Sequence, residues 1–388
     1  MTNQDDKRTV YLDHAAATPV APEVFDAMVP FVRDEFYNPS APYAQARATK
    51  AHLEDARERV GHVIGSRAGN VTFTAGATEA NNLAFAAVGG HVVTDAIEHE
   101  SVLACAQGRE TTVVGVSAVG RVDPDAVRNA ITPATELVSI ELANGEIGTI
   151  QPVREIAHVV AAERMRRLEA RERRPLLLHT DASQAAGHIS VNVSTLGVDL
   201  MTLSAAKIYG PKQVGLLWHA DGVPLRPLVR GGGQEGGIRS GTENVAGAVG
   251  FACALELAEK MRAEESRRLR SLARRLREGI AAGVPDAVFS GPARERGRLP
   301  GLVHVSFAGA EARRLVIGLE RRGVLVGTGS ACAASRMRVS HVLRAIGLSD
   351  EVAQGSLRLT LGRATTEPDV DYAVEAIVSC VNQERARA

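Results

Sequence analysis

Two spacings of apolar residues alternate along most of the chain. From about residue 44, short apolar runs are separated by longer segments in which apolar residues recur every three or four positions. The short runs are typical of buried strands, and the longer segments are typical of amphipathic helices. Strands alternating with helices predict βαβ units and a mostly parallel, doubly wound sheet, which is an α/β fold. The strand candidates begin at Val71, His91, Thr112, Leu137, Leu176, Leu200 and Gly215.

The helix signals in this region are equally regular. Residues 44–64 carry arginine and glutamate on one face, and a further helix is expected from about Thr78. Asp123 followed by Pro124 predicts an N-cap and the first turn of another helix.

The pattern changes near residue 230. Residues 230–237 (RGGGQEGG) predict a loop, and a long helical pattern follows from about Asn244 to Ala282. Strand candidates at 288–290, 302–307 and 357–361, separated by helical stretches, predict a smaller α+β domain. We expect a large domain over residues 14–250 and a small C-terminal domain over residues 251–388, with residues 1–13 packing on the small one.

The composition excludes several classes of protein. The 388 residues are 45% apolar and 23% charged, as in ordinary soluble globular proteins. Acidic and basic residues number 45 each, so the net charge of zero gives no electrostatic case for a nucleic-acid or membrane-surface binder. No apolar run has transmembrane length, the N-terminus lacks the apolar core of a signal peptide, and no Cys-x-x-Cys pair predicts a metal site. We therefore expect a cytoplasmic protein without metal, nucleic-acid or membrane partners.

Lysine is rare in this arginine-rich chain. It occurs only at Lys7, Lys50, Lys207, Lys212 and Lys260. Lys207 follows the strand candidate at 200–203, and open α/β sheets bind ligands at the carboxyl ends of their strands. A lysine partly withdrawn from water there can form a Schiff base with a carbonyl compound. An ordinary surface charge on a loop explains Lys207 equally well, because a single strand-end lysine is a weak motif.

Polar groups follow two other strand candidates. Asp181 and Gln184 come directly after the run at 176–178, where a buried acid needs a partner, although a helix N-cap also explains Asp181. Residues 76–79 (GATE) offer backbone N–H groups and the Thr78 hydroxyl, which suit a phosphate. Capping of the helix by Thr78 explains the same residues without any ligand.

His99 and Arg358 are further candidates for chemistry. His99 lies near a helix start, where it would stack on a flat ring or move protons, or serve as a satisfied structural histidine. Arg358 alternates with leucines, so it points away from them. Arginine suits a bidentate clamp on a carboxylate, but a surface arginine is the alternative in a chain with so many.

The four cysteines fall into two groups. Cys332 lies among glycines and small residues, a pattern typical of an exposed loop. Cys105, Cys253 and Cys380 lie in apolar helical patterns and are interpreted as core residues. An exposed thiol in a reducing compartment is usually kept for its reactivity, so Cys332 is the candidate nucleophile.

Together, these segments resemble the cysteine desulfurases of the NifS/IscS group, which are class V, fold-type I pyridoxal phosphate enzymes. The resemblance covers about residues 10–385 and implies a large domain with a mostly parallel seven-stranded sheet plus a smaller α+β domain. The shared segments are YLDHAAATP (11–19), GATEANN (76–82), EHESV (98–102), NGEIG (144–148), DASQ (181–184), KIYGPK (207–212), RSGTEN (239–244) and GSAC (329–332).

The resemblance also implies how a cofactor is bound. Lys207 would carry pyridoxal 5′-phosphate as a Schiff base, Asp181 would pair with the ring nitrogen and Gln184 with the ring hydroxyl. His99 would stack on the ring and take part in catalysis. The groups implied to hold the phosphate are Ala77, Thr78, Ser204 and, across a homodimer, Thr242 of the partner subunit.

For the reaction, the resemblance implies conversion of L-cysteine to L-alanine. Arg358 would clamp the substrate carboxylate, and Lys207 would remove the proton on Cα. The Cys332 thiolate would attack the substrate sulfur and be left as a persulfide, for transfer to a sulfur-acceptor protein such as an iron–sulfur scaffold or a thiolation protein. The glycine- and alanine-rich segment around Cys332 would supply the flexible tether that this transfer needs.

Two positions depart from the family pattern. Ala206 stands where the family usually has a histidine before the lysine, and Gly145 stands where it often has a second asparagine. Asn144 is therefore the residue expected to contact cofactor and substrate there. The alternatives are a selenocysteine lyase, another class V lyase or aminotransferase, and a catalytically weak scaffold of the same fold.

Overall fold

The computed structural model describes residues 8–329 and 339–386. Its largest sheet has seven strands in the order β2-β8-β7-β6-β5-β3-β4, and β8 runs against the other six. The strands of this sheet are β2 (Val71–Thr74), β3 (His91–Asp95), β4 (Thr111–Val114), β5 (Thr135–Ser139), β6 (Leu177–Asp181), β7 (Leu200–Ser204) and β8 (Gly215–His219). The predicted α/β fold with a mostly parallel sheet is confirmed.

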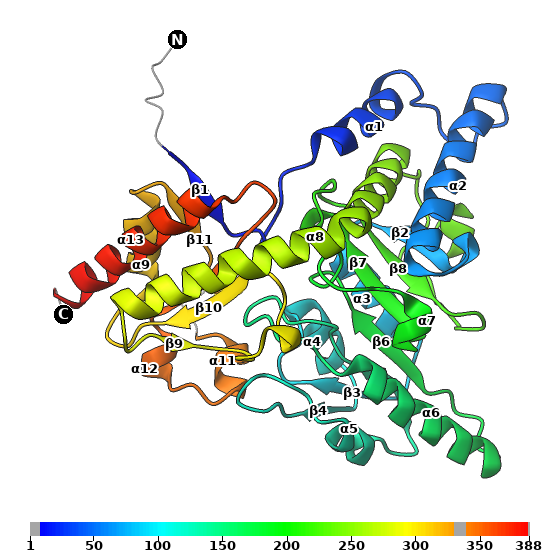
Figure 1. Cartoon of the computed structure of the whole chain (residues 1–388). Helices are drawn as coiled ribbons and strands as arrows, with labels where there is room; N and C mark the ends of the chain where they lie inside the picture. Colours follow the sequence, from blue (N-terminus) through cyan, green and yellow to red (C-terminus); the bar gives the residue numbers. More distant parts are fainter. Residues whose placement is uncertain (1–7, 330–338, 387–388) are drawn as a thin grey trace.

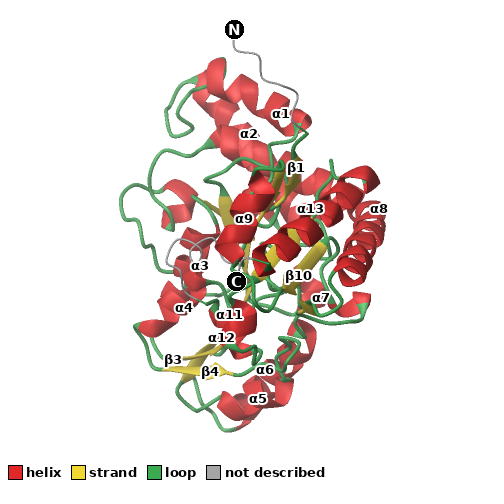
Figure 2. Ribbon diagram, turned by 90° about the vertical axis from the view of Figure 1, so that its left-hand side faces the viewer, coloured by secondary structure: helices red, strands yellow, loops and turns green. Residues whose placement is uncertain are grey.

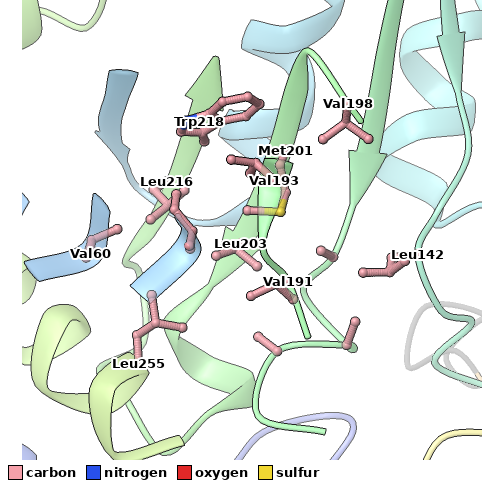
Figure 3. Packing of buried hydrophobic residues seen from close by; sticks show 14 of the residues in the cluster. Val60, Leu142, Val191, Val193, Val198, Met201, Leu203, Leu216, Trp218 and Leu255 are labelled. Carbon is pink, nitrogen blue, oxygen red and sulfur yellow. The ribbon is translucent and has the colours of Figure 1, made fainter. Parts of the chain in front are cut away.

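Helices cover both faces of this sheet. Alternate side chains of a strand point to opposite faces, so each face has its own apolar core that helices must cover. Leu216 of β8 joins the core on one face, and its neighbour Leu217 joins the core on the other. Figure 3 shows side chains of β7 and β8 gathered with Val60 and Leu255, which come from helices on the first face. The covering helices are α1 (Pro22–Arg33), α2 (Ala44–Ile64), α3 (Ala77–Ala86), α4 (Glu100–Gln107), α5 (Pro124–Ala130), α6 (Val153–Glu169) and α7 (Val193–Leu196).

The predicted helix boundaries agree closely with the structure. The expected helix over residues 44–64 is α2, and Asp123 caps α5 by accepting a hydrogen bond from the N–H of Asp125. The long helix expected from Asn244 is α8 (Val245–Gly283), with the Asn244 side chain as its N-cap. Local capping chemistry thus set where these helices begin.

Helix α8 joins two cores. Its buried residues up to Ala258 belong to the core on the seven-stranded sheet, and those from Leu269 onwards belong to a second core. Figure 1 shows the helix crossing from the large sheet toward β10 and α13. We propose that the two domains, with the division expected at residue 250, meet along this helix.

The second core lies around a three-stranded antiparallel sheet in the order β12-β10-β9. A two-stranded parallel sheet, β1 (Val10–Leu12) with β11 (Val324–Val326), brings Val10 and Leu12 into the same core. Figure 2 shows α9 and α13 beside β10. The remaining elements are β9 (Val288–Phe289), β10 (Leu302–Ser306), α9 (Ala312–Glu320), α11 (His341–Ala345), α12 (Asp350–Ala353), β12 (Ser356–Thr360) and α13 (Glu367–Arg385).

None of the helices within residues 8–329 and 339–386 combines the length and the apolarity needed to cross a lipid bilayer.

The glycine-rich stretch at 230–237 is held to the large sheet by a buried ion pair. Arg57 of α2 donates two hydrogen bonds to the Glu235 carboxylate, at 2.7 and 2.9 Å, and a third to the carbonyl of Val71 at 2.8 Å. Glu235 also accepts the N–H of Phe73 at 2.9 Å. The two charged side chains are only 9% and 4% exposed, so each depends on the other for its charge.

Replacement of Glu235 by alanine should therefore lower the free energy of unfolding by about 3–5 kcal/mol, because it leaves the buried Arg57 guanidinium with only the half-exposed Glu54 carboxylate, 3.1 Å from its Nε, as a counter-ion. The measurement is the denaturant midpoint followed by circular dichroism. The matched control is Asp371→Ala, which removes the carboxylate from the half-exposed pair with Arg275 and should barely move the midpoint. Equal effects of the two substitutions would contradict the assignment.

Candidate active site

A cavity of about 350 Å³ opens at the carboxyl ends of the parallel strands. Its walls come from the segments that follow β2, β3, β5, β6 and β7, together with β12 and α11. Strand ends at such a sheet edge are where doubly wound folds place their ligands. The site residues expected from the sequence that line this cavity are Ala77, Thr78, His99, Asn144, Asp181, Gln184, Ser204, Lys207 and Arg358.

Lys207 lies at the end of a short 3-10 helix, Ala205–Lys207, directly after β7. Its Nζ donates hydrogen bonds to the carbonyl oxygens of Ala15 at 2.9 Å and Ala16 at 2.6 Å. Burial lowers the pKa of this amine, and the nearby Arg358 charge lowers it further. A half-buried amine with a lowered pKa is a better nucleophile toward carbonyl compounds than a surface loop lysine. Lys212 donates to the Thr18 carbonyl and does not line the cavity.

A chain of hydrogen bonds connects Asp181 with His99. Asp181 accepts hydrogen bonds from the N–H of Ser183 at 2.9 Å and from Asn81 Nδ2 at 2.8 Å. Asn81 Nδ2 also donates to Ser101 Oγ at 2.9 Å, and that hydroxyl lies 2.8 Å from His99 Nδ1. The Asn81 side chain is fully buried, so it fixes the Asp181 carboxylate from behind. The sequence pattern does not predict a role for Asn81, because Asn82 is also an asparagine and the pattern does not show which of the two faces Asp181.

His99 is the N-cap of α4. Its Nδ1 accepts a hydrogen bond from the N–H of Ser101 at 3.1 Å, so the neutral ring carries its proton on Nε2. The ring itself is exposed and lines the cavity. His99 therefore satisfies the helix start through Nδ1, as the structural alternative expects, and it also lines the cavity.

Helix α3 begins at the cavity with Gly76 as its N-cap. Gly76 has a φ of 123°, a backbone conformation that favours glycine, and it has no side chain to accept the first N–H groups of the helix. Thr78 is the second residue of the helix, so the alternative in which Thr78 is the cap is wrong. The open N–H groups, with the Thr78 and Ser204 hydroxyls on the cavity wall, suit a phosphate.

Arg358 is only 6% exposed, so the surface-arginine alternative is wrong. It projects from the opposite face of β12 to the core residues Leu357 and Leu359, as its alternation with leucines predicts. Its Nη2 donates to Asp13 Oδ1 at 2.8 Å, and its Nη1 donates to the Gly145 carbonyl at 3.2 Å. Nε is buried and has no hydrogen-bond partner among the described residues, whereas Nη1 and Nη2 each use one N–H in these contacts and keep a second one for a carboxylate.

Asn144 lies on the cavity wall, but the protein itself uses its amide. Its Nδ2 donates to the Ile97 carbonyl at 3.0 Å and to Glu141 Oε1 at 2.8 Å. Its Oδ1 accepts the N–H groups of Glu146 and Ile147, both at 2.9 Å. In this arrangement Asn144 organises the turn at 144–147, and its amide hydrogens are already engaged.

The absence of a side chain at position 145 has a steric explanation that the sequence does not reveal. A Cβ at this position would lie 2.9 Å from Cγ of Gln184. Gln184 is held there by a hydrogen bond from its Nε2 to the Ala15 carbonyl at 3.0 Å. The departure from the family pattern at 145 thus makes room for Gln184 beside the N-terminal segment.

Three buried carboxyl groups surround the floor of the cavity, and the sequence analysis missed all of them. Burial raises the pKa of Asp95 to about 7 and raises those of Glu98 and Glu141 well above the ordinary range. The charges of neighbouring carboxylates, Asp181 among them, raise the pKa values of Glu98 and Glu141 further. These three groups therefore favour their protonated forms more than ordinary carboxyl groups do.

The other expected site residues lie elsewhere. Thr242 lines a separate cavity of about 260 Å³ beside Arg239 and Gln213. Cys332 lies outside the described residues. No group of three or more His, Cys, Asp or Glu side chains in the described ranges is arranged to hold a metal ion.

The remaining cysteines lie on helices, as expected. Cys380 is buried, whereas Cys105 and Cys253 are only partly buried, so the core interpretation holds fully for Cys380 alone. Burial raises the pKa of each of these three thiols, which makes them poor nucleophiles.

Comparison with known proteins gives consistent findings. The Aminotransferase class-V family matches residues 10–373. The cysteine desulfurase IscS of Clostridium botulinum is 40% identical over 390 residues, covering 97% of this chain and 96% of that protein. The solved structure of a NifS-like protein superposes with a TM-score of 0.87 at 32% identity, over 97% of this chain and 100% of that one. SspA in complex with cysteine superposes with a TM-score of 0.76 at 32% identity, over 91% and 99% of the two chains.

The raised pKa of Asp95 predicts how stability depends on pH. The fold binds the proton more tightly than the unfolded chain does, so the Asp95 contribution to stability falls as pH rises from about 4 to about 7 and is constant above that. Asp95→Asn cannot lose a proton, so its unfolding free energy should lack this fall with pH. The unfolding free energy of the wild type should therefore decrease relative to that of the variant between about pH 4 and about pH 7. Urea denaturation across the pH range measures the difference.

The matched control is Asp26→Asn on the exposed face of α1. It should leave the wild-type pH dependence unchanged. A parallel pH dependence for Asp95→Asn and the wild type would show that Asp95 does not hold a proton in the fold.

Proposed function

The chain belongs to the class-V aminotransferase family and is a pyridoxal phosphate-dependent cysteine desulfurase, and on this premise we propose how its residues carry out the reaction. The observation that carries the proposal is one cavity that joins a lysine of lowered pKa, the partly buried Asp181 and the guanidinium of Arg358. A carbonyl cofactor, its ring nitrogen and an amino-acid carboxylate each find a suitable partner among these three groups.

The residues present fit pyridoxal phosphate. The open start of α3 at Gly76 suits the phosphate, with Ala77, Thr78 and Ser204 as the groups that hold it. Lys207 would form the Schiff base, Asp181 would hold a proton on the ring nitrogen, and Gln184 would face the ring hydroxyl. When bound, the cofactor supplies an electron sink for the electron pair left on the substrate Cα.

We propose that Arg358 binds the carboxylate of L-cysteine. The second N–H of Nη1 and of Nη2 supplies donor capacity, and the low exposure of Arg358 strengthens an ionic contact by excluding water. Lys207, once its Nζ is free, takes the Cα proton. The buried Asn81 holds the Asp181 carboxylate in place by donating to its Oδ2. His99 presents its Nε2–H and ring face to the cavity for stacking and proton movement.

We propose that Cys332 accepts the sulfur. Its thiolate attacks the substrate sulfur, the S–S bond forms, and the C–S bond of cysteine breaks. Cα and Cβ regain protons, so one cysteine and one enzyme thiol become one alanine and one enzyme persulfide. This step needs no external reductant, because the enzyme thiol is oxidised to the persulfide as the cysteine carbon is reduced to that of alanine.

The assembly and partners are also proposals. Thr242 lies outside the Lys207 cavity of its own chain, which supports a homodimer in which Thr242 of the partner subunit completes the phosphate site. Transfer of persulfide sulfur to an iron–sulfur scaffold or a thiolation protein requires reduced thiols, so we place the reaction in the cytoplasm.

The first test is covalent. Borohydride reduction of cofactor-loaded protein, followed by peptide mass mapping, should place one pyridoxyl adduct on Lys207, because reduction fixes the Schiff base. Lys212→Ala is the control and should keep the adduct. An adduct on another lysine, or none in fully loaded material, would contradict the proposal.

The second test separates sulfur transfer from other class V reactions. Cys332→Ser should retain bound cofactor but lose persulfide formation from cysteine, with alanine production falling by at least about 100-fold, because the nucleophile is gone. Cys253→Ser, on α8, should retain both activities. Full alanine production by Cys332→Ser would favour an aminotransferase or lyase that needs no enzyme thiol.

A further inference from the structure

Glu146 is a buried acid that the proposed reaction leaves without a role. It follows Gly145 in the turn that Asn144 organises, and its N–H donates to Asn144 Oδ1 at 2.9 Å. The residue is 4% exposed. An acid in such a place is costly to ionise unless a partner compensates the charge.

The contacts of the carboxyl group leave one oxygen available for a proton. Oε2 accepts a hydrogen bond from Ser340 Oγ at 2.9 Å. Oε1 has no hydrogen-bond partner among the described residues. Oε1 lies against Gly329, where a Cβ would approach it to 2.7 Å, and Gly329 has a φ of 84°. A side chain at 329 is therefore excluded by both space and backbone conformation.

Arg358 is the charge that acts on Glu146. The carbonyl of Gly145, directly before Glu146, accepts a hydrogen bond from Arg358 Nη1 at 3.2 Å. Burial raises the pKa of Glu146 to about 7, while the Ser340 hydrogen bond and the Arg358 charge both act to lower it. The other charged or titratable groups nearby are Asp13, which pairs with Arg358, and those that line the same cavity: Glu98, His99, Glu100, Glu141, Asp181, Lys207 and His341.

We propose that Glu146 is a positioning residue whose ionisation sets how strongly Arg358 holds the carboxylate of the amino-acid substrate. The inference rests on the proposed role of Arg358 as the carboxylate clamp. Ionised Glu146 interacts through space with the Arg358 charge, without a direct ion pair, so its negative charge weakens the attraction of Arg358 for the substrate carboxylate. Protonation of Glu146 at Oε1 removes that competition, and the Ser340 hydrogen bond to Oε2 is kept.

Binding of substrate is then coupled to uptake of a proton. A carboxylate on Arg358 offsets the positive charge that favours ionised Glu146, so the Glu146 pKa rises in the complex. By linkage, substrate affinity falls as pH rises through the neutral range in which free Glu146 ionises. A glutamine at 146 has the shape of the protonated acid and cannot ionise, so it removes this coupling.

The experiment measures kcat and KM for L-cysteine from about pH 6 to about pH 8.5 in the wild type, Glu146→Gln and Ser340→Ala. The ratio of KM in the wild type to KM in Glu146→Gln should be close to one at the low end and rise by on the order of three- to tenfold at the high end. The ratio of kcat values should stay constant with pH. Titration of cysteine itself affects both enzymes equally and cancels in the ratio.

Ser340→Ala provides an independent variant. It removes the hydrogen bond that favours the ionised acid, so the rise in KM should move to higher pH than in the wild type. Because Glu146 itself is intact in this variant, the shift remains a test if Glu146→Gln fails to fold. A KM ratio that does not change with pH, or an unshifted profile in Ser340→Ala, would overturn the proposal.

A binding measurement separates this proposal from the proposed function. The probe is 3-mercaptopropionate, which has the carboxylate and thiol of cysteine but no amine. Calorimetric titration near pH 7.5 in two buffers of different protonation enthalpy should show proton uptake in the wild type and little in Glu146→Gln. Equal uptake in both would overturn the role of Glu146, whereas a wild type that makes no alanine from cysteine would overturn the proposed function instead.

Discussion

The ion pair between Arg358 and Asp13 is the interaction on which the site depends. It joins β12 of the second core to the segment after β1, at a place where the guanidinium is only 6% exposed. The same N-terminal segment supplies the carbonyl oxygens of Ala15 and Ala16 to Lys207. A buried cation must have partners, so the two cations of the site fix the path of residues 13–16 between the two cores. The cavity is the space that this path leaves above the ends of the parallel strands.

The charge state of the site is decided largely by burial. Lys207 is pushed toward its neutral form, and Asp95, Glu98 and Glu141 are pushed toward theirs, because water is excluded around all of them. Asp181 differs in its contacts, because Ser183 N–H and Asn81 Nδ2 both donate to its oxygens. An amine of lowered pKa and a hydrogen-bonded carboxyl group thus line one cavity.

Of the two positions that depart from the family pattern, Gly145 is explained by its neighbours, whereas nothing in the structure explains the alanine side chain at 206. Gly145 leaves the space that the Gln184 side chain fills, and its carbonyl accepts a hydrogen bond from Arg358. The Ala206 carbonyl accepts the N–H of Thr18 at 3.0 Å, so this residue helps to hold the N-terminal segment through its backbone. The residues that contact Gly145 and Ala206 lie far away along the chain, so these contacts cannot be read from the neighbouring residues in the sequence.

The sequence by itself determined the periodicity of the strands and helices, the cap of α5, the approximate start of α8, and the placing of Lys207, Asp181 and residues 76–79 at strand ends. These features follow from local spacing and from the rule that parallel strands end at one edge. The tertiary structure alone decided that Arg358 is buried against Asp13, that Asn81 links Asp181 to His99, and that Glu146 packs against Gly329 and Ser340. Contacts of this kind join residues distant in sequence, and burial, which sets their protonation, is a property of the assembled fold rather than of any segment.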